Sequence, residues 1–271
     1  MGRGCKMFDI TSSIVTYNTK LDELKKAIES FLNTDLNVHL YISDNSPNDN
    51  LRKIIEELND NRITYIFNNK NGGYGWGHNQ IVKKLMAKSK YHLILNPDIY
   101  FKKGVLEELY AYMEENKEVG NIMPMVKYPN GEIQYLCKRI PSPKDLFLRK
   151  FCPIKSIIER NNLKYEMRET GYNKIMNVPI LSGCFMFIRT EVFESVGLFD
   201  ERYFMYMEDF DLSRRIHKQY KTLFYPNVEI VHAHAKESFK NRKMAKIHLR
   251  AAIKYFNKWG WLFDKQRGEI A

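Results

Sequence analysis

Hydrophobic positions in the first half of the chain follow two alternating patterns. Short apolar runs rich in β-branched residues are typical of buried strands. Such runs occur at residues 13–17, 38–43, 62–67 and 91–95. Between them, apolar residues recur at spacings of three and four, as at Leu21, Leu24, Ile28 and Phe31, which predicts helices. Repeated strand–helix units predict an α/β fold with a mostly parallel central sheet and helices on both faces.

The second half of the chain is less regular. A turn signal at residues 128–132 precedes a basic stretch with three prolines, which indicates an accessory segment. A compact apolar run at residues 180–188 indicates that order resumes there, and strands are expected at residues 221–225 and 228–232. Helical spacing predicts helices at residues 209–220 and 241–256.

Polar residues follow several of the expected strands directly. Parallel sheets bind ligands at the carboxyl ends of their strands, so we expect these residues to share one edge. They are Thr16, Tyr17, Asn18, Asp44, the glycine-rich residues 71–79, Asn96 and Asp98. A carboxylate at this edge, such as Asp98, can hold Mn²⁺ or Mg²⁺ against a diphosphate. The alternative is a turn in which Asp98 caps a helix beginning near Lys103.

The glycine-rich segment contains Asn71, Gly75 and Asn79 and opens a helix. Glycine lets the backbone approach a phosphate closely, and a helix N-terminus favours negative charge. A dinucleotide-binding site is disfavoured, because the third glycine is Gly77, which makes GxGxG, and the segment follows the third strand instead of the first.

Three acidic residues, Glu208, Asp209 and Asp211, lie within four positions just before a helix. One of them can accept a proton from an attacking hydroxyl, whereas capping of the helix by another is the simpler alternative. His232 and His234 end a late strand. Zinc would need a third ligand nearby, but one imidazole can complete the coordination of a cation held by Asp98.

The composition narrows the class of protein. The chain has 271 residues, 44% of them hydrophobic and 13% aromatic, which excludes a disordered chain. Four cysteines without regular spacing indicate neither a zinc ribbon nor a disulfide framework, and favour a reduced, cytoplasmic compartment. No apolar run is long enough to span a bilayer, so any membrane contact is expected to be peripheral.

The formal net charge of +11 is unevenly distributed. Residues 138–174 have ten Lys and Arg against four Asp and Glu, and residues 236–271 have ten against three. The rest of the chain is slightly acidic. A nucleic-acid-binding protein would interleave basic and aromatic residues on one surface, but here the basic segments lie apart from the polar edge, so we expect no nucleic-acid partner.

The C-terminal segment combines two stripes of side chains at helical spacing. The basic stripe is Lys243, Lys246, Arg250, Lys254 and Lys258, and the apolar stripe is Met244, Ile247, Ala251, Tyr255 and Trp259. Such a helix can lie on the inner face of an anionic membrane, which would make the protein peripherally associated with the inner membrane. The alternative is a helix whose apolar side packs on the catalytic domain while its lysines are solvated.

Seven motifs in order resemble the family 2 glycosyltransferases. They are residues 14–18, 42–46, 96–98, 182–184, 197–201, 208–212 and 231–232. Within the family, the chain looks most like the bacterial rhamnosyltransferases that build surface polysaccharides such as O-antigen or capsule. The resemblance implies a GT-A fold with a Rossmann-like nucleotide-sugar-binding half at 8–127, a basic accessory segment at 128–178 and an acceptor-binding half at 179–240. Residues 1–240 would be the catalytic domain and 241–271 a basic amphipathic helix.

The resemblance also implies roles for single residues. The nucleotide would be held by Thr16, Tyr17, Asn18 and Asp44, with Asp44 accepting a hydrogen bond from the pyrimidine ring. The glycine-rich segment with Asn71, Gly75 and Asn79 would face the sugar diphosphate, and Asn96 would also contact the nucleotide sugar. Asp98 and His232 would bind the divalent cation. Asp209 would be the catalytic base, and Glu208 would orient the acceptor. The family commonly has Gly-x-Ser after the histidine, where this chain has residues 235–238 without that pattern.

The implied reaction is an inverting transfer of a sugar from a nucleotide diphosphate, with L-rhamnose from dTDP-rhamnose as the first expectation. The acceptor would be a hydroxyl of a growing, polyprenyl-diphosphate-linked glycan. A UDP-hexose such as galactose or glucose is the alternative donor. A sugar-phosphate nucleotidyltransferase is disfavoured, because its N-terminal glycine-rich loop is missing after Val15.

Overall fold

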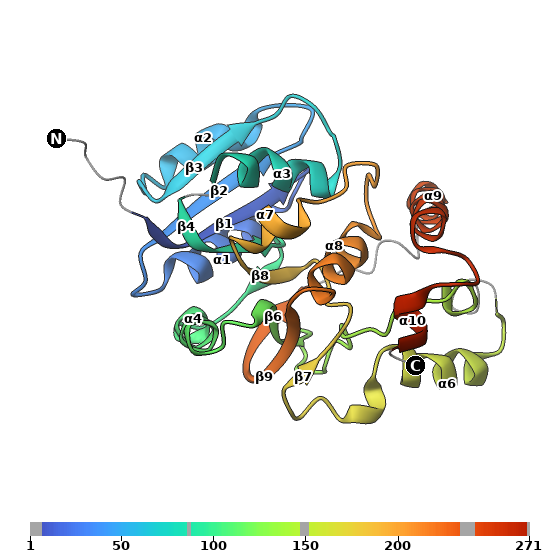
Figure 1. Cartoon of the computed structure of the whole chain (residues 1–271). Coiled ribbons are helices and arrows are strands. Elements are labelled where there is room, and N and C mark those ends of the chain that lie inside the picture. The colour runs from blue at the N-terminus through green and yellow to red at the C-terminus, as the bar shows by residue number, and fades with distance from the viewer. Residues whose placement is uncertain (1–6, 86–87, 147–151, 234–241, 270–271) are drawn as a thin grey trace.

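The strands expected in the first half of the chain form one parallel half of a mixed sheet (Figure 1). The computed structural model describes residues 7–85, 88–146, 152–233 and 242–269. The parallel strands, in spatial order, are β3 (Ile63–Phe67), β2 (Val38–Asp44), β1 (Phe8–Thr16) and β4 (Ser89–Leu95). Their carboxyl ends meet at one edge, where Thr16 is the register partner of Asp44.

The second half of the chain extends this sheet. Beyond β4 the order continues with β8 (Phe185–Arg189), β6 (Val119–Lys127), β9 (Lys221–His232) and β5 (Ile99–Tyr100), and β7 (Met176–Asn177) pairs with β9. Only β8, β5 and β7 run against the others in the described sheet, so the α/β fold with a mostly parallel sheet is confirmed. The two strands expected after residue 220 are one strand, β9, whose pairing with β6 shifts register after Pro124.

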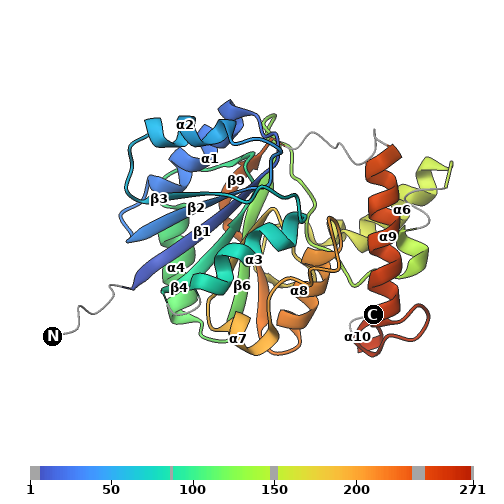
Figure 2. The ribbon, with the colours of Figure 1, turned by 90° about the horizontal axis from the view of Figure 1, so that it is seen from above.

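Helices cover both faces of the sheet, as expected (Figure 2). One face carries α1 (Leu21–Leu32), α2 (Asn50–Glu57) and α4 (Val105–Glu115). The other carries α3 (Tyr74–Leu85), α7 (Val192–Val196) and α8 (Glu208–His217). Alternate side chains of a strand point to opposite faces. On β4, Leu93 and Leu95 therefore pack in the first layer, while Ile94 packs in the second.

The basic segment after residue 128 is anchored in the core. It contains α6 (Lys155–Tyr165) and a short 3₁₀ turn, η1 (Arg168–Thr170). Tyr172 is fully buried. Its hydroxyl accepts a hydrogen bond from the backbone amide of Cys137 at 2.9 Å and donates to the carbonyl of Glu166 at 2.7 Å. The segment thus shares the hydrophobic core of the sheet while it carries α6 on the outside.

The expected C-terminal helix is present as α9 (Arg242–Trp259), followed by α10 (Lys265–Glu269). Its apolar stripe packs inward, because Ala251, Tyr255 and Phe256 are buried against Tyr203 and Met207. The basic stripe is not wholly solvated: Lys254 donates to the carbonyl of Arg202, and Lys258 forms ion pairs with Asp200 and Asp211. None of the described helices is both long enough and apolar enough to cross a bilayer.

Candidate active site

The loop after β4 brings Asp98 against the end of β9. Ile99 and His232 are register partners, and His232 Nε2 lies 3.3 Å from Asp98 Oδ1. Burial disfavours the charged imidazole, but the neighbouring Cys184 and Asp98 outweigh this effect and raise the pKa of His232 above its usual range. Capping by Asp98 is excluded as its role, because α4 begins at Val105 and the Gly104 amide donates to Glu107.

Asp98 and His232 fit one side of a divalent-cation site. A carboxylate oxygen and a neutral imidazole nitrogen suit a cation such as Mn²⁺, which would displace the imidazole proton on binding. Phosphate oxygens of a substrate commonly supply further ligands. Within the described ranges, no three His, Cys, Asp or Glu side chains are grouped as a complete metal site. Binding of a cation by Asp98 and His232 therefore stays a prediction, in which a diphosphate would supply the further ligands. His234 and residues 235–238 lie outside the described residues.

Asp209 lies at the start of α8, where the chain enters the helix through two residues with positive φ, Tyr206 and Met207. The backbone amides of Gly183 and Phe210 each donate a 2.9 Å hydrogen bond to its carboxylate. Burial raises the pKa of Asp209, while these amides and the charge of Lys138 act in the opposite direction. A carboxylate with a raised pKa is suited to accept a proton from a hydroxyl.

Glu208 differs from Asp209 in its surroundings. It is 5% exposed, and its Oε2 atom has no hydrogen-bond partner among the described residues. Burial and the adjacent charge of Asp209 raise the pKa of Glu208 to about 8. The protonated form of Glu208 is thus favoured by its surroundings, so the two neighbouring carboxyl groups can have different roles.

Tyr74 connects the loop that carries Asn96 and Asp98 with Gly183, and sequence reasoning missed it. Its hydroxyl lies 2.7 Å from the carbonyl oxygen of Gly183 and 3.0 Å from Asn96 Oδ1. Burial and the nearby acidic groups raise its pKa well above 10, so the hydroxyl remains a hydrogen-bond donor. The only signal in the sequence was an aromatic residue inside the glycine-rich segment.

The glycine-rich segment is packed against protein along much of its length. Gly73 has a φ of 99°, and a Cβ there would lie 2.1 Å from the carbonyl oxygen of Phe204. A Cβ on Gly75 would lie 2.8 Å from Phe199. These glycines permit α3 to contact the loop before α8. Gly75 thus has a packing role, and its expected contact with the sugar diphosphate stays a prediction.

Asn79 also has a role that differs from the expected one. Its amide donates to the carbonyl of Phe199 and to Glu201, both at 2.9 Å, and accepts from the amide of Phe199. Both polar groups of this buried side chain are thus used to hold the segment that leads to α8. Asn71 is exposed, and its side chain accepts from the amide of Gly73. Its expected contact with the donor stays a prediction.

Asp44 lies at the carboxyl edge of the sheet and is fully buried. Oδ1 accepts from the Thr16 hydroxyl at 2.9 Å and the Ser46 amide at 3.0 Å, and Oδ2 accepts from the Tyr65 hydroxyl at 2.7 Å. Because the side chain is fully buried under these contacts, the expected hydrogen bond from Asp44 to a nucleobase stays a prediction. Tyr17 directly follows the end of β1 and is exposed. Asn18 adopts a φ of 49°, and its backbone amide donates a hydrogen bond to the Ser46 hydroxyl.

Asp211, the third acidic residue of the motif, faces α9. Its Oδ1 accepts from Trp259 Nε1 at 2.8 Å and pairs with Lys258 at 2.7 Å, and its Oδ2 pairs with Arg215 at 2.9 Å. The carboxylate is therefore neither a helix cap nor a group of the reaction site. Its contacts link α9 to α8.

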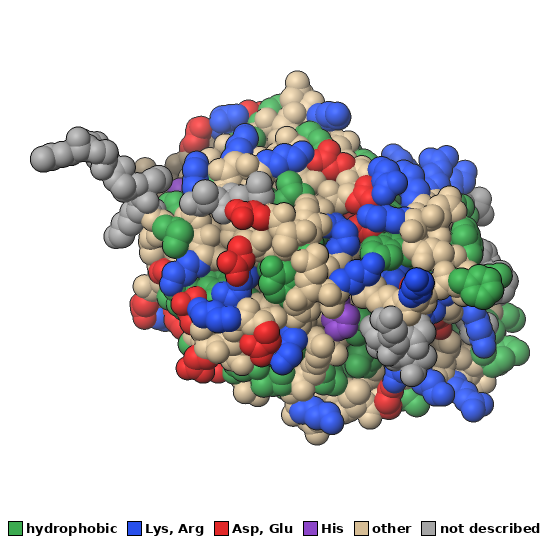
Figure 3. All heavy atoms as spheres, viewed as in Figure 1, with side chains coloured by type: hydrophobic (Ala, Val, Ile, Leu, Met, Phe, Trp, Pro, Cys, Tyr) green, Lys and Arg blue, Asp and Glu red, His purple; other side chains and the backbone are tan. Residues whose placement is uncertain are grey.

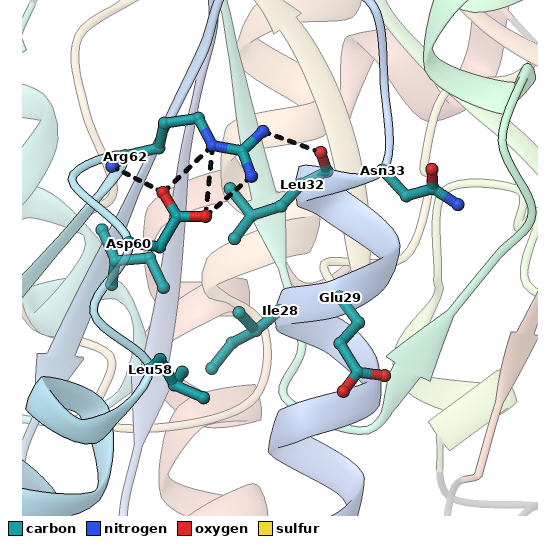
Figure 4. A pocket seen from close by; sticks show the side chains of 8 residues that line it. Ile28, Glu29, Leu32, Asn33, Leu58, Asp60 and Arg62 are labelled. Carbon is teal, nitrogen blue, oxygen red and sulfur yellow. Dashed lines mark hydrogen bonds and ion pairs between the residues drawn. The ribbon is translucent and has the colours of Figure 1, made fainter.

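A surface cavity of about 330 Å³ lies away from these residues (Figure 4). It is lined by residues between the end of α1 and the start of β3, including Leu32, Asp60 and Arg62. Arg62 pairs with Asp60 at 2.7 Å and donates to the carbonyl of Leu32 at 2.9 Å. This cavity is at the amino ends of the parallel strands, opposite the candidate site.

Comparisons with known proteins show to which family the chain is similar. The model of the family described as glycosyl transferase family 2 matches residues 13–197. The rhamnosyltransferase WbbL of Escherichia coli K12 is 27% identical over 247 residues, covering 86% of this chain and 88% of its own. The N-acetylglucosaminyl-diphospho-decaprenol L-rhamnosyltransferase of Mycobacterium tuberculosis is 26% identical over 218 residues, covering 74% of this chain and 68% of its own.

Solved structures share the fold at low sequence identity. GalNAc-T7, crystallised with UDP, GalNAc and Mn²⁺, has a TM-score of 0.63 at 17% identity; the match covers 83% of this chain and 43% of that one. Residues 1–349 of Staphylococcus aureus TarS in complex with UDP have a TM-score of 0.58 at 14% identity, over 97% of this chain and 69% of that one. Since the family model covers more than half of the sequence, the chain belongs to glycosyltransferase family 2, a family of inverting sugar transferases.

Proposed function

We propose that the protein transfers a sugar, first of all L-rhamnose from dTDP-rhamnose, to a hydroxyl of a lipid-linked bacterial surface glycan. Two relatives that cover most of this chain are rhamnosyltransferases, and one of them acts on a decaprenyl-diphosphate-linked acceptor by its name. A UDP-hexose is the second candidate donor, because a further relative, Agl10 of Haloferax volcanii, is a hexosyltransferase at 24% identity.

One observation carries the proposed mechanism: the consecutive residues Gly183 and Cys184 form hydrogen bonds with Asp209, the proposed base, and with Asn96, in the loop that carries Asp98. The amide of Gly183 donates to Asp209, and the carbonyl of Cys184 accepts from the amide of Asn96 at 2.9 Å. This shared support keeps a proton acceptor and a candidate diphosphate site in a constant relation. Such pre-arranged groups are what a single displacement at a sugar carbon requires.

In the proposed reaction, the acceptor oxygen forms a bond to the anomeric carbon while the bond from that carbon to the diphosphate breaks. Asp209 takes the proton of the acceptor hydroxyl. Glu208, whose protonated form is favoured by its surroundings, can donate a hydrogen bond that orients the acceptor. Asp98 and His232 would hold a divalent cation, which supplies positive charge for the leaving diphosphate.

The nucleotide would lie at the edge formed by Thr16, Tyr17, Asn18 and Asp44, with Asn71 and Asn96 on the diphosphate side. For a lipid-linked acceptor the enzyme has to work at a membrane surface, which we propose to be the cytoplasmic face of the inner membrane. The basic amphipathic character of α9 supports such a peripheral contact.

A thermal-shift panel of dTDP-, UDP- and GDP-sugars with and without Mn²⁺ tests the donor. The true donor should raise the melting temperature most, since a ligand that binds only the folded state stabilises it. Asp98→Ala should remove the contribution of Mn²⁺ to this shift. Equal shifts with and without the metal in the wild-type protein would contradict the cation site.

The base is tested by Asp209→Asn, which should nearly abolish transfer and leave donor affinity within about a few-fold, because only the proton acceptor is removed. Asp211→Asn is the matched control on the same helix. It should lower stability through the lost contacts to α9, with turnover of the folded protein retained. Full turnover of Asp209→Asn would exclude this residue as the base.

A further inference from the structure

Exposed apolar side chains gather at one end of the molecule. Of the fourteen large hydrophobic side chains that are exposed among the described residues, eight belong to α6 and its entry or to the segment from α9 to α10. They are Ile154, Ile157, Leu163, Leu249, Ile253, Trp261, Leu262 and Phe263. Both ribbon views have α6, α9 and α10 at the same end, away from the parallel strands (Figures 1 and 2). We call these eight side chains the apolar end.

The same end of the molecule is basic. All the excess positive charge of the chain belongs to residues 138–174 and 236–271, whose described parts include α6, α9 and α10. Lys246 and Arg250 are exposed on α9 beside Leu249, and Lys265 is exposed directly after the turn between α9 and α10. Figure 3 shows Lys and Arg side chains gathered over this end, with hydrophobic side chains among them.

The apolar side chains of the turn between α9 and α10 are exposed to solvent. Trp261, Leu262 and Phe263 are 44%, 81% and 93% exposed. The turn begins at Gly260, which has a φ of 100°. It ends at Asp264, whose carboxylate is 3% exposed and forms an ion pair with the fully buried Arg214 at 2.7 Å. The exposed side chains therefore lie between two anchored positions.

We propose that the apolar end is a docking surface for an anionic lipid bilayer and that Trp261, Leu262 and Phe263 insert into its interface. Aromatic and large apolar side chains next to Lys and Arg are the composition that favours this interface. The positive surroundings complement anionic headgroups. A second copy of the chain would present the same positive charge across a twofold contact, so like charges would oppose self-association.

The docking surface is joined to the catalytic body by buried polar contacts. Arg214 lies on α8, the helix that begins with Glu208 and Asp209, and its guanidinium also stacks 4.0 Å from the Trp259 ring centroid. A bilayer bound to the turn would therefore have a set orientation relative to the candidate base. The purpose of this surface, access to a lipid-linked acceptor, rests on the proposed function. Binding of the surface to a bilayer can be tested independently of that function.

The test compares sedimentation of the full chain with vesicles of phosphatidylglycerol and phosphatidylethanolamine. The triple variant W261S/L262S/F263S should lose at least about tenfold in partitioning, because three large apolar side chains no longer leave water. Its matched control is L21S/L58S, which removes two exposed apolar side chains from α1 and the end of α2, and which should sediment like the wild type.

A second variant separates charge from apolar insertion. Lys246→Gln with Arg250→Gln should weaken binding to the anionic vesicles by roughly fivefold per charge and leave binding to phosphatidylcholine vesicles unchanged. Brominated lipids should quench the wild-type tryptophan emission. Trp261→Phe should remove most of that quenching, because Trp76 lies in α3 and the Trp259 ring is covered by the buried Arg214.

Two results would overturn the docking surface. One is equal sedimentation of the triple variant and its control. The other is a wild-type dimer in lipid-free solution that the triple variant converts to a monomer, since a second copy would then be the occupant. Donor binding in the thermal-shift panel should be unchanged in the triple variant, so a failure of the proposed donor chemistry is detected separately from a failure of the docking surface.

Discussion

The backbone amide of Gly183 donates a 2.9 Å hydrogen bond to Oδ2 of Asp209, and the two residues are in such close contact that no side chain fits between them. A Cβ on Gly183 would lie 2.8 Å from the Cβ of Asp209. The strand that starts at Phe185 thus sets the position of a carboxylate on α8, a helix that follows much later in the chain.

Gly183→Ala should therefore impair transfer strongly. The added methyl group has to displace Asp209, and a shift of the base by about 1 Å can lower the rate on the order of 100-fold. We expect kcat to fall while the dissociation constant of the nucleotide sugar changes little. Ser182→Ala, one residue earlier, serves as the control in the same steady-state assay; equal effects of the two substitutions would contradict the role of this contact.

Glu208 should make the protein less stable as pH rises. Its pKa is raised from the ordinary 4.5 to about 8 in the folded state, so the folded protein binds the proton more tightly than the unfolded chain. The associated stability is fully present below about 4.5 and is lost as pH rises through about 8, by at most about 1.4 kcal/mol per pH unit.

Glu208→Gln has no proton to lose and should abolish this dependence. The measurement is urea unfolding of the variant and the wild type at several pH values across that window. The difference in their unfolding free energies should grow in favour of the variant as pH rises. Parallel curves would mean that Glu208 is not protonated in the folded state.

Lys138 should control the pH at which Asp209 becomes a base. Its charge lowers the pKa of Asp209, and its Nζ lies 5.6 Å from the ring centroid of the neighbouring Phe210. In Lys138→Met the pKa of Asp209 should rise, so the acidic limb of the kcat profile should move to higher pH. Lys138→Arg keeps the charge and should keep the profile; an unshifted limb in Lys138→Met would exclude this coupling.

Arg214 should be among the most costly residues to replace. Its side chain is fully buried and donates to Asp264 at 2.9 and 2.7 Å, to Tyr255 at 2.9 Å and to Gln266 at 3.0 Å. Arg214→Met removes the two shorter bonds of the buried Asp264 carboxylate and leaves it, among the described residues, only the longer contacts with Arg267 at 3.3 Å, which should cost about 3–5 kcal/mol of unfolding free energy.

The matched control for Arg214 is Arg202→Met, which breaks an exposed pair with Asp200 and should cost at most about 1 kcal/mol. Urea titration followed by tryptophan emission measures both variants, since Trp259 lies beside Arg214. A loss in Arg214→Met no larger than that in the control would show that the C-terminal segment contributes little to the stability of the fold.

Local patterning was enough to identify most of the individual elements. The four parallel strands of the first half correspond to short apolar runs, and the long C-terminal helix corresponds to apolar residues at spacings of three and four, because each pattern reports which sides of an element are buried. The motif residues at strand ends likewise follow from a general property of parallel sheets. Asp98 and Asp44 lie at the edge expected from the sequence alone.

Tertiary structure decided which distant residues meet. The contacts of Asp209 with Gly183, of Asp211 with α9 and of Tyr74 with Asn96 depend on how α8, β8 and α3 pack, and no local spacing encodes them. For the same reason the sequence did not predict that Gly75 and Asn79 both contact Phe199. The sequence thus determined the family and the candidate reactive groups, whereas packing of side chains from distant segments decided which of those groups remain available for chemistry.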